Sequence, residues 1–278
     1  MSTAVALPLG TDLADITSRI REHIVTMCAG PDGGHLGGSM SLVEILAALY
    51  FRVMRVDPAD PDAPDRDILL LSKGHGGIGL YATLAEAGYF PRERLAEYSM
   101  PGGQFMAHPH PEIPGVEAPS GSLGHGLAMG IGYAVAAQLD GSDRRCFVVL
   151  GDGETQEGSV WEAAAVASHH GLSNLTAVID RNRLQITGGT EQVSGLEPMA
   201  QRWRAFGWTV REVDGHDVDA LTGALDAPSE RGRPTLVLAN TVKGKGLPFI
   251  EGDVRSHYAK LKERQYHKAM AVLRRSRS

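Results

Sequence analysis

The chain has 278 residues, of which 42% are hydrophobic and 22% charged, and its formal net charge at pH 7 is −6. These values exclude a disordered chain and allow one large domain or two smaller ones. Basic residues cluster only over 274–277, which argues against nucleic-acid binding. Residues 1–10 lack the features of a secretory signal, and Cys28 and Cys146 have neither disulfide-framework nor metal-site spacing, so we expect a cytoplasmic protein.

Two amphipathic helices are predicted near the N-terminus. Apolar residues recur every three or four positions over 12–29, with Asp12 as the N-cap, and again over 42–53. The segment between them, 30–38, is so rich in glycine that we expect a loop that belongs to a site. Prolines and acidic residues over 57–64 predict a surface loop.

A segment without Asp, Glu, Lys or Arg covers residues 118–139. Its length would suffice to cross a membrane, but His125, Gln138 and several glycines make it too polar for a membrane-spanning helix. The sequence therefore predicts a buried helix. Gly126 and Gly130 lie one turn apart on one face of it, where we expect a neighbouring segment to approach closely.

Short apolar runs without polar alternation predict strands that are covered on both faces. They occupy residues 67–71, 145–150, 175–180 and 234–239, with a further strand over 208–213. Because helical stretches separate these runs, the sequence favours an α/β fold, a parallel sheet with helices on both faces. We expect a single domain over 1–278, with a C-terminal helix over 258–273 and flexible ends over about 1–11 and 274–278.

Groups that suit a metal and a diphosphate follow two of these strands. The strand over 145–150 continues into Gly151, Asp152 and Gly153, and Asn182 follows the next strand, 30 positions after Asp152. Ligands bind at the carboxyl ends of parallel strands, where glycine lets backbone N–H groups approach a phosphate. Asp152, Asn182 and a nearby carbonyl would leave about three positions of an octahedral Mg²⁺ for diphosphate and water.

This pattern resembles the thiamine diphosphate motif of transketolases and their relatives, in which Gly-Asp-Gly is followed at a similar distance by Asn. Other segments are similar to transketolases in the same order, from about Asp12 to His257. They are the glycine-histidine loop 33–39, the Ser-Lys-Gly-His-Gly stretch 72–76, His108-Pro109 with 114–117, the glycine-rich turn 121–126, and 243–246 with His257 beyond.

The resemblance implies the thiamine-diphosphate-binding fold and a set of site residues. Asp152, Asn182 and the Leu184 carbonyl would hold Mg²⁺ against the diphosphate of thiamine diphosphate. Gly153, His75 and His257 would contact the cofactor, and so would the turn formed by Gly121, Ser122 and Leu123. Four histidines would shuttle protons on and off sugar hydroxyls, because imidazole titrates near neutral pH: His35, His75, His108 and His257.

Several assignments stay open at this point. His110 stands two positions from His108, and only the distance to Pro114 favours the first. Lys243 and Lys245 suit either phosphate contact or a solvated glycine hinge. Glu157 suits either an interface acid of the family or a helix-start glutamate. We interpret the remaining candidates as surface or structural histidines: His23, His169, His170, His216 and His267.

The resemblance also implies a partner chain. In transketolases a second domain supplies the glutamate that protonates the pyrimidine ring of the cofactor, and only 21 residues follow His257. We therefore expect the N-terminal subunit of a split transketolase, which transfers a two-carbon ketol unit between sugars or sugar phosphates. A separate C-terminal subunit would complete an α₂β₂ assembly. The donor, the acceptor and the pathway are left open.

Three other interpretations compete with this one. The α subunit of a 2-oxo acid dehydrogenase shares the Gly-Asp-Gly and Asn motif but lacks the His35 and His75 loops. A 1-deoxyxylulose phosphate synthase fragment is disfavoured by the match at 114–117. A non-catalytic diphosphate-binding module would keep the pocket without its chemistry.

Overall fold

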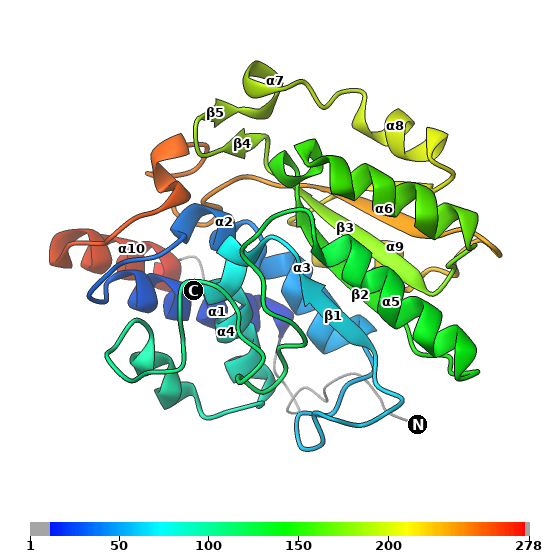
Figure 1. Cartoon of the computed structure of the whole chain (residues 1–278). Helices are drawn as coiled ribbons and strands as arrows, with labels where there is room; N and C mark the ends of the chain where they lie inside the picture. The colour runs from blue at the N-terminus through cyan, green and yellow to red at the C-terminus, as the bar shows by residue number, and fades with distance from the viewer. Residues whose placement is uncertain (1–11, 276–278) are drawn as a thin grey trace.

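The computed structural model describes residues 12–275, which form a five-stranded parallel sheet between two layers of helices (Figure 1). The strand order is β1-β2-β3-β7-β6. The strands are β1 Ile68–Leu71, β2 Cys146–Gly151, β3 Leu175–Arg181, β6 Thr209–Asp214 and β7 Thr235–Asn240. Each lies within one residue of the predicted run, so the fold class and all five strands are confirmed. A separate antiparallel pair joins β4 Leu184–Gln185 and β5 Gly188–Gly189.

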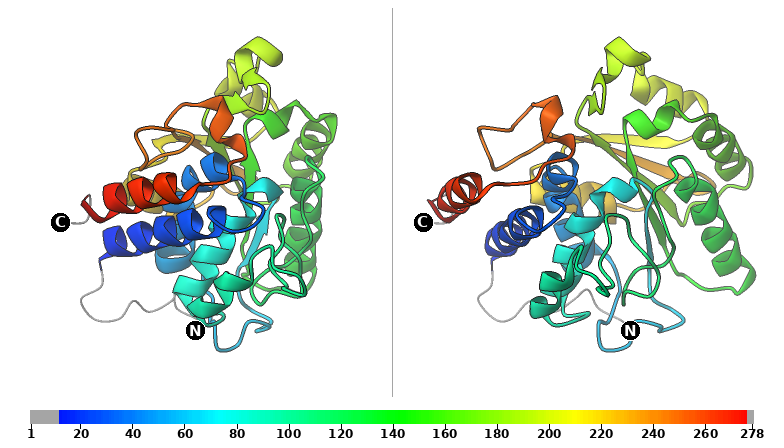
Figure 2. Two further views of the ribbon diagram at one scale, coloured as in Figure 1. Left: turned by 90° about the vertical axis from the view of Figure 1, so that its left-hand side faces the viewer. Right: turned by 60° about the vertical axis from the view of Figure 1, so that its left-hand side comes forward.

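Alternate side chains of the strands enter two different hydrophobic cores. In β2, Phe147 and Val149 belong to one core, whereas Cys146, Val148 and Leu150 belong to the other. This explains the unbroken apolar runs, because both faces of the sheet are buried. Figure 2 shows the two helical layers. One contains α1 Leu13–Cys28, α3 Val43–Ala48, α4 Gly77–Ala87, α9 Val218–Asp226 and, packed on α1, α10 Glu263–Arg275; the other contains α5 Gly126–Leu139, α6 Gly158–His169 and α8 Met199–Ala205.

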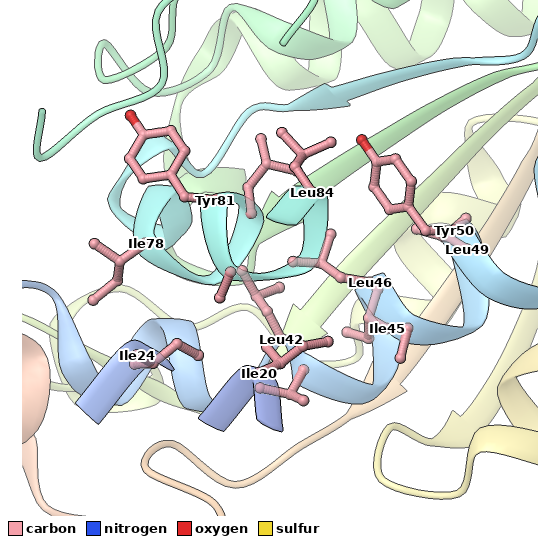
Figure 3. Packing of buried hydrophobic residues seen from close by; sticks show 14 of the residues in the cluster. Ile20, Ile24, Leu42, Ile45, Leu46, Leu49, Tyr50, Ile78, Tyr81 and Leu84 are labelled. Carbon is pink, nitrogen blue, oxygen red and sulfur yellow. The ribbon is translucent and has the colours of Figure 1, made fainter. Parts of the chain in front are cut away.

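The first core lies where α1, α3 and α4 meet (Figure 3). Asp12 caps α1 as predicted, because its Oδ1 accepts a hydrogen bond from Ala14 N at 3.3 Å. The second predicted helix begins at Val43 and ends in a π-helical turn over Leu49–Val53. Among the described residues, Leu36–Val53 is the one helical stretch long and apolar enough to cross a membrane, and 94% of it is buried inside the fold.

The expectation of a loop over 30–38 is wrong in part, because Leu36–Met40 forms a short helix, α2. Glycine disfavours helix, so local propensity would not predict this element. Tertiary packing stabilises it instead. A Cβ atom on Gly37 would lie 2.2 Å from Ser256 Oγ, so only glycine fits against the chain that crosses it.

The uncharged segment is helical only from Gly126, and α5 buries only one face. The prediction of a buried helix over 118–139 is therefore wrong in extent, and Leu139 is 82% exposed. The close approach predicted for its glycines is confirmed. A Cβ atom on Gly126 would lie 2.4 Å from Ser72 Cβ, and one on Gly130 would lie 2.5 Å from Val148 Cγ2.

The C-terminal helix begins at Glu263 rather than at Tyr258 and ends at Arg275. It starts later because Ala259 pairs with Gly34 in an isolated antiparallel bridge, which keeps the preceding residues extended. The expectation of a flexible end from 274 is thus wrong for Arg274 and Arg275, which belong to α10. The rest of the ends predicted to be flexible, 1–11 and 276–278, lies outside the described residues.

Two glycines of α5 provide a matched test of this packing. Gly130→Ala places a methyl group against Val148, whereas Gly132 has open space around its Cβ position. Alanine gains about 1 kcal/mol over glycine in a helix, but overpacking costs about 1–3 kcal/mol. We expect Gly130→Ala to lower the free energy of unfolding in urea and Gly132→Ala to raise it. Equal stability of the two variants would contradict the close approach of α5 to β2.

Candidate active site

Four strands end at one edge of the sheet, and the residues that follow three of them deliver polar side chains to a common cavity. Lys73 and His75 follow β1, Asp152 follows β2, Asn182 follows β3 and Lys243 follows β7. A cavity of about 330 Å³ lies at this edge. Its lining includes Lys73, His75, Leu123, Asp152, Gly153, Asn182, Leu184 and His257. A cavity thus lies at the carboxyl edge of the sheet, the place where ligands bind in parallel sheets.

Asp152, Asn182 and Leu184 lie together because β2 and β3 are in register, with Gly151 opposite Asp180. Asn182 donates from Nδ2 to Asp180 Oδ2 at 3.2 Å, and its Oδ1 accepts from Leu184 N at 3.1 Å. The Asp180 bond therefore sets the orientation of the Asn182 amide.

The oxygen donors at this edge suit Mg²⁺. Burial, together with repulsion from Asp180, raises the pKa of Asp152, and a bound cation would relieve both effects. Within residues 12–275, no group of three or more His, Cys, Asp or Glu side chains could hold a metal. A metal here would therefore take amide, carbonyl and cofactor oxygens in addition to the one carboxylate, which is the donor chemistry that Mg²⁺ prefers.

Two buried lysines stand at or beside the cavity. Lys73 is fully buried and forms an ion pair with Asp180. Lys243 is 1% exposed, and its Nζ lies 3.2 Å from the Leu184 carbonyl oxygen and 2.9 Å from His257 Nδ1. No carboxylate of the described chain forms an ion pair with Lys243. Burial and the charge of Lys73 lower the pKa of Lys243 to about 8. An anion such as a diphosphate would satisfy this charge.

The alternative of a solvated glycine hinge is therefore wrong for Lys243, which sequence pattern alone could not place. Lys245 is half-buried and lines a different surface hollow with Asp214 and His216.

The four predicted histidines form one cluster. The His35 ring centroid lies 5.8 Å from that of His75, 5.4 Å from His108 and 5.5 Å from His257. The His75 and His257 rings are 5.2 Å apart. The bridge between Gly34 and Ala259 brings the two distant loops together. His110 lies outside the cluster and is exposed, with its Nδ1 near Glu112 N.

Three of the clustered imidazoles, those of His35, His75 and His257, are neutral at pH 7. Burial first, and then the positive charges of neighbouring groups, lower the pKa of His35 to about 4 and that of His257 to about 3. The pKa of His75 is also well below its ordinary value, with burial the largest cause. Each neutral ring offers one acceptor nitrogen. Within residues 12–275, Nδ1 of His35 is buried and has no hydrogen-bond partner.

The turn expected to contact the cofactor is divided between two surfaces. Leu123 lines the cavity, and Gly121 packs on His108, where a Cβ atom would lie 3.2 Å from Cδ2 of that ring. Ser122 is exposed and lines a small neighbouring hollow instead.

Glu157 lies at the rim of the cavity as the N-cap of α6, but its side chain makes no capping hydrogen bond.

Sequence reasoning missed Glu154, a buried carboxylate behind the turn. Glu154 accepts hydrogen bonds from Ser72 Oγ and, at 2.9 Å each, from Gly124 N and Gly151 N. It therefore connects the turn to β1 and β2. A signal was present, because acidic residues are rarely buried without such partners and Glu154 stands one residue past Gly-Asp-Gly. Sequence reasoning also missed Lys73 and Asp180, which form a buried ion pair.

The remaining histidines lie outside the cluster. His23 contacts Glu86 at 2.9 Å, His216 contacts Glu44 at 3.0 Å, and His267 lies 3.8 Å from Glu263. His169 and His170 are exposed at the end of α6. These positions agree with the surface and structural roles that we assigned to them.

The low pKa of His35 predicts how stability depends on pH. Between about pH 6.5 and pH 4 the unfolded chain binds a proton at His35 that the folded chain resists, so stability falls as the pH falls. We expect His35→Asn to reduce this loss, seen as a shallower pH dependence of the free energy of unfolding. The matched control is His169→Asn, at an exposed position, which should keep the wild-type slope. Identical slopes for His35→Asn and wild type would contradict the buried neutral ring.

Comparisons with known proteins agree with this geometry. The family described as "Transketolase, thiamine diphosphate binding domain" matches residues 14–274. The chain is 46% identical over 242 residues to the 6-deoxy-6-sulfo-D-fructose transketolase subunit SqwG of Clostridium sp. (strain MSTE9), with 86% of this chain and 88% of that protein covered. It is 45% identical over 241 residues to one subunit of the apulose-4-phosphate transketolase of Actinobacillus succinogenes, with 86% and 87% covered.

Solved transketolases share the fold. A transketolase variant from Pichia stipitis superposes with a TM-score of 0.88 at 32% identity, covering 95% of this chain and 41% of the other. Transketolase from Leishmania mexicana gives a TM-score of 0.85 at 30% identity, with 95% and 44% covered. The chain thus spans about two fifths of the length of these enzymes and most of the length of the matched subunits. The chain belongs to the transketolase family of thiamine diphosphate-dependent transferases and carries its thiamine diphosphate-binding domain.

Proposed function

We propose that this chain is the diphosphate-binding subunit of a two-component transketolase, which moves a two-carbon ketol unit from a ketose or its phosphate to an aldose or its phosphate. One observation carries this proposal: four histidines, three of them with lowered pKa values, cluster beside the cavity. Asp152 and Asn182 line this cavity, and Lys243 contacts the carbonyl of Leu184, which also lines it. Proton-transfer groups and anion-binding groups are thereby placed at one sheet edge.

The cavity residues fit the cofactor and its metal. Asp152, Asn182 and the Leu184 carbonyl would hold Mg²⁺, and Gly153 N–H, His75 and Lys243 would face the diphosphate. A Cβ atom on Gly153 would lie 3.1 Å from Gln185 Oε1, so glycine allows the close approach of Gln185 to this turn. When bound, thiamine diphosphate supplies the electron sink that accepts the two-carbon unit.

The histidines position and exchange protons on the sugar. As neutral rings at pH 7, His35, His75 and His257 can accept a proton from one substrate hydroxyl and return it to another. His35 stands at the centre of the cluster, and its buried Nδ1 has no hydrogen-bond partner among the described residues. His257 is held by Lys243 and His108 packs against Gly121, so both ring positions are fixed before substrate binds.

A second chain is required to complete the site. The matched relatives are themselves described as subunits, and the solved transketolases that share this fold are more than twice as long. Ile186 lines the cavity yet is 68% exposed, which suits cover by another polypeptide. We propose that a C-terminal subunit supplies the glutamate that activates the pyrimidine ring, in an α₂β₂ assembly. The cytoplasm is the compartment that we propose, since both buried cysteines are free.

Reconstitution tests the divided site. The chain is purified alone and together with the product of the adjacent reading frame, and ketol transfer is assayed with thiamine diphosphate and Mg²⁺. We expect turnover only from the mixture, because the activating acid is absent from the chain alone. Robust turnover by the chain alone would overturn the two-component proposal.

Substitutions at the site separate an enzyme from a non-catalytic module. Asp152→Asn should weaken cofactor binding about 10–100-fold and reduce activity with it, because a metal ligand is lost. His35→Ala should reduce turnover about 10²–10⁴-fold while the cofactor dissociation constant changes little, because general acid–base catalysis contributes that factor. His169→Ala is the control and should keep full activity. An assembled wild-type complex that binds cofactor without transfer would favour the module.

A further inference from the structure

Arg181 is a buried arginine that contacts the carboxylate assigned to the metal. It is the last residue of β3, and its side chain is 1% exposed. Its Nη1 donates to Asp152 Oδ2 at 3.1 Å and to Thr190 Oγ1 at 2.8 Å. Its Nη2 donates to Glu191 Oε1 at 3.1 Å and to Glu197 Oε1 at 2.8 Å. One guanidinium group therefore joins Asp152 to the segment that follows β5.

Arg181 and two backbone N–H groups together restrict the rotation of the Asp152 carboxylate. Oδ2 of Asp152 also accepts a hydrogen bond from Arg183 N, and Oδ1 accepts from Gly153 N at 2.7 Å. Three donors on two oxygens leave the carboxylate little freedom to rotate about its Cβ–Cγ bond. The position of Arg183 N is itself set by the same segment, because Thr190 N donates to Arg183 O at 3.0 Å.

Electrostatic attraction to the metal cannot explain a cation at this place. A guanidinium beside a Mg²⁺ ligand repels the ion and lowers the negative charge available to it. The geometry has a mechanical explanation instead. Arg181 is fixed at its far edge by Glu191 and Glu197, so it transmits their position to Asp152. The planar fork of arginine spans carboxylates on two sides, which the single ammonium group of lysine does not do.

We propose that Arg181 is a positioning residue of the metal site. It orients Asp152 for the cation, and Glu191 of α7, Thr190–Val193, and Glu197 beyond it serve as its anchors. The inference rests on the proposed function, in that it takes Asp152 as a ligand of Mg²⁺. It adds that metal affinity depends on Glu191 and Glu197, which lie 39 and 45 positions further along the chain than Asp152.

The test measures metal affinity rather than turnover. The complex of this chain with its C-terminal partner is saturated with thiamine diphosphate, and Mn²⁺ is titrated while free Mn²⁺ is followed by electron paramagnetic resonance. We expect Arg181→Met and Arg181→Lys each to raise the Mn²⁺ dissociation constant about 10–100-fold, the usual effect of removing a partner of a metal ligand. The matched control is Arg204→Met, which removes an exposed arginine paired with Glu212 and should bind Mn²⁺ as the wild type does.

Each outcome decides between specific alternatives. Wild-type or tighter Mn²⁺ binding by Arg181→Met would overturn the positioning role, even if thermal stability fell. Full affinity in Arg181→Lys would show that charge alone matters and would likewise overturn it. If Arg181→Met does not fold, the double substitution Glu191→Gln with Glu197→Gln removes the half-exposed anchors instead and must also weaken Mn²⁺ binding. Asp152→Asn is run in parallel, because unchanged affinity there would reject the metal site itself.

Discussion

The site depends on one fully buried ion pair between Lys73 and Asp180, which joins the ends of β1 and β3. The Asp180 carboxylate also accepts hydrogen bonds from Ser41, Thr241 and Asn182. Those donors come from the segment after α2, from the end of β7 and from the residue that follows β3. Removal of one partner of such a pair leaves an uncompensated buried charge and costs about 3–5 kcal/mol. The pair therefore has a structural role, and it also orients the amide of Asn182.

The charges of two buried lysines help to set the protonation states of the neighbouring histidines. Lys73 and Lys243 are both buried, and their positive charges disfavour protonation of the nearby histidines. Desolvation acts in the same direction on His35, His75 and His257, so these three rings are neutral at pH 7. The lysines are therefore available to an anion while the three rings remain unprotonated at neutral pH.

Hydrogen bonds behind the site connect elements that are far apart in the sequence. Glu154 joins the turn before α5 to β1 and β2, and Arg181 joins Asp152 to the segment between β5 and α8. The bridge from Gly34 to Ala259 brings His35 and His257 into one cluster. Cavity residues such as Asp152 are thus held in place by residues from distant parts of the chain, and the chemistry at the cavity depends on both.

Local patterns in the sequence determined the five strands, the α1 helix with its Asp12 cap, and the strand ends that carry Asp152 and Asn182, because periodicity and glycine placement act over short distances. They also indicated which histidines gather, through resemblance to a known family. Tertiary structure alone decided the helix at Leu36–Met40, the late start of α5 and of α10, and the burial of Lys243. It also revealed Glu154, Asp180 and Arg181 as supports of the site. Each of these depends on a partner distant in sequence, whether a crossing backbone, an opposing charge or a hydrogen-bond donor, and no local pattern specifies such a partner.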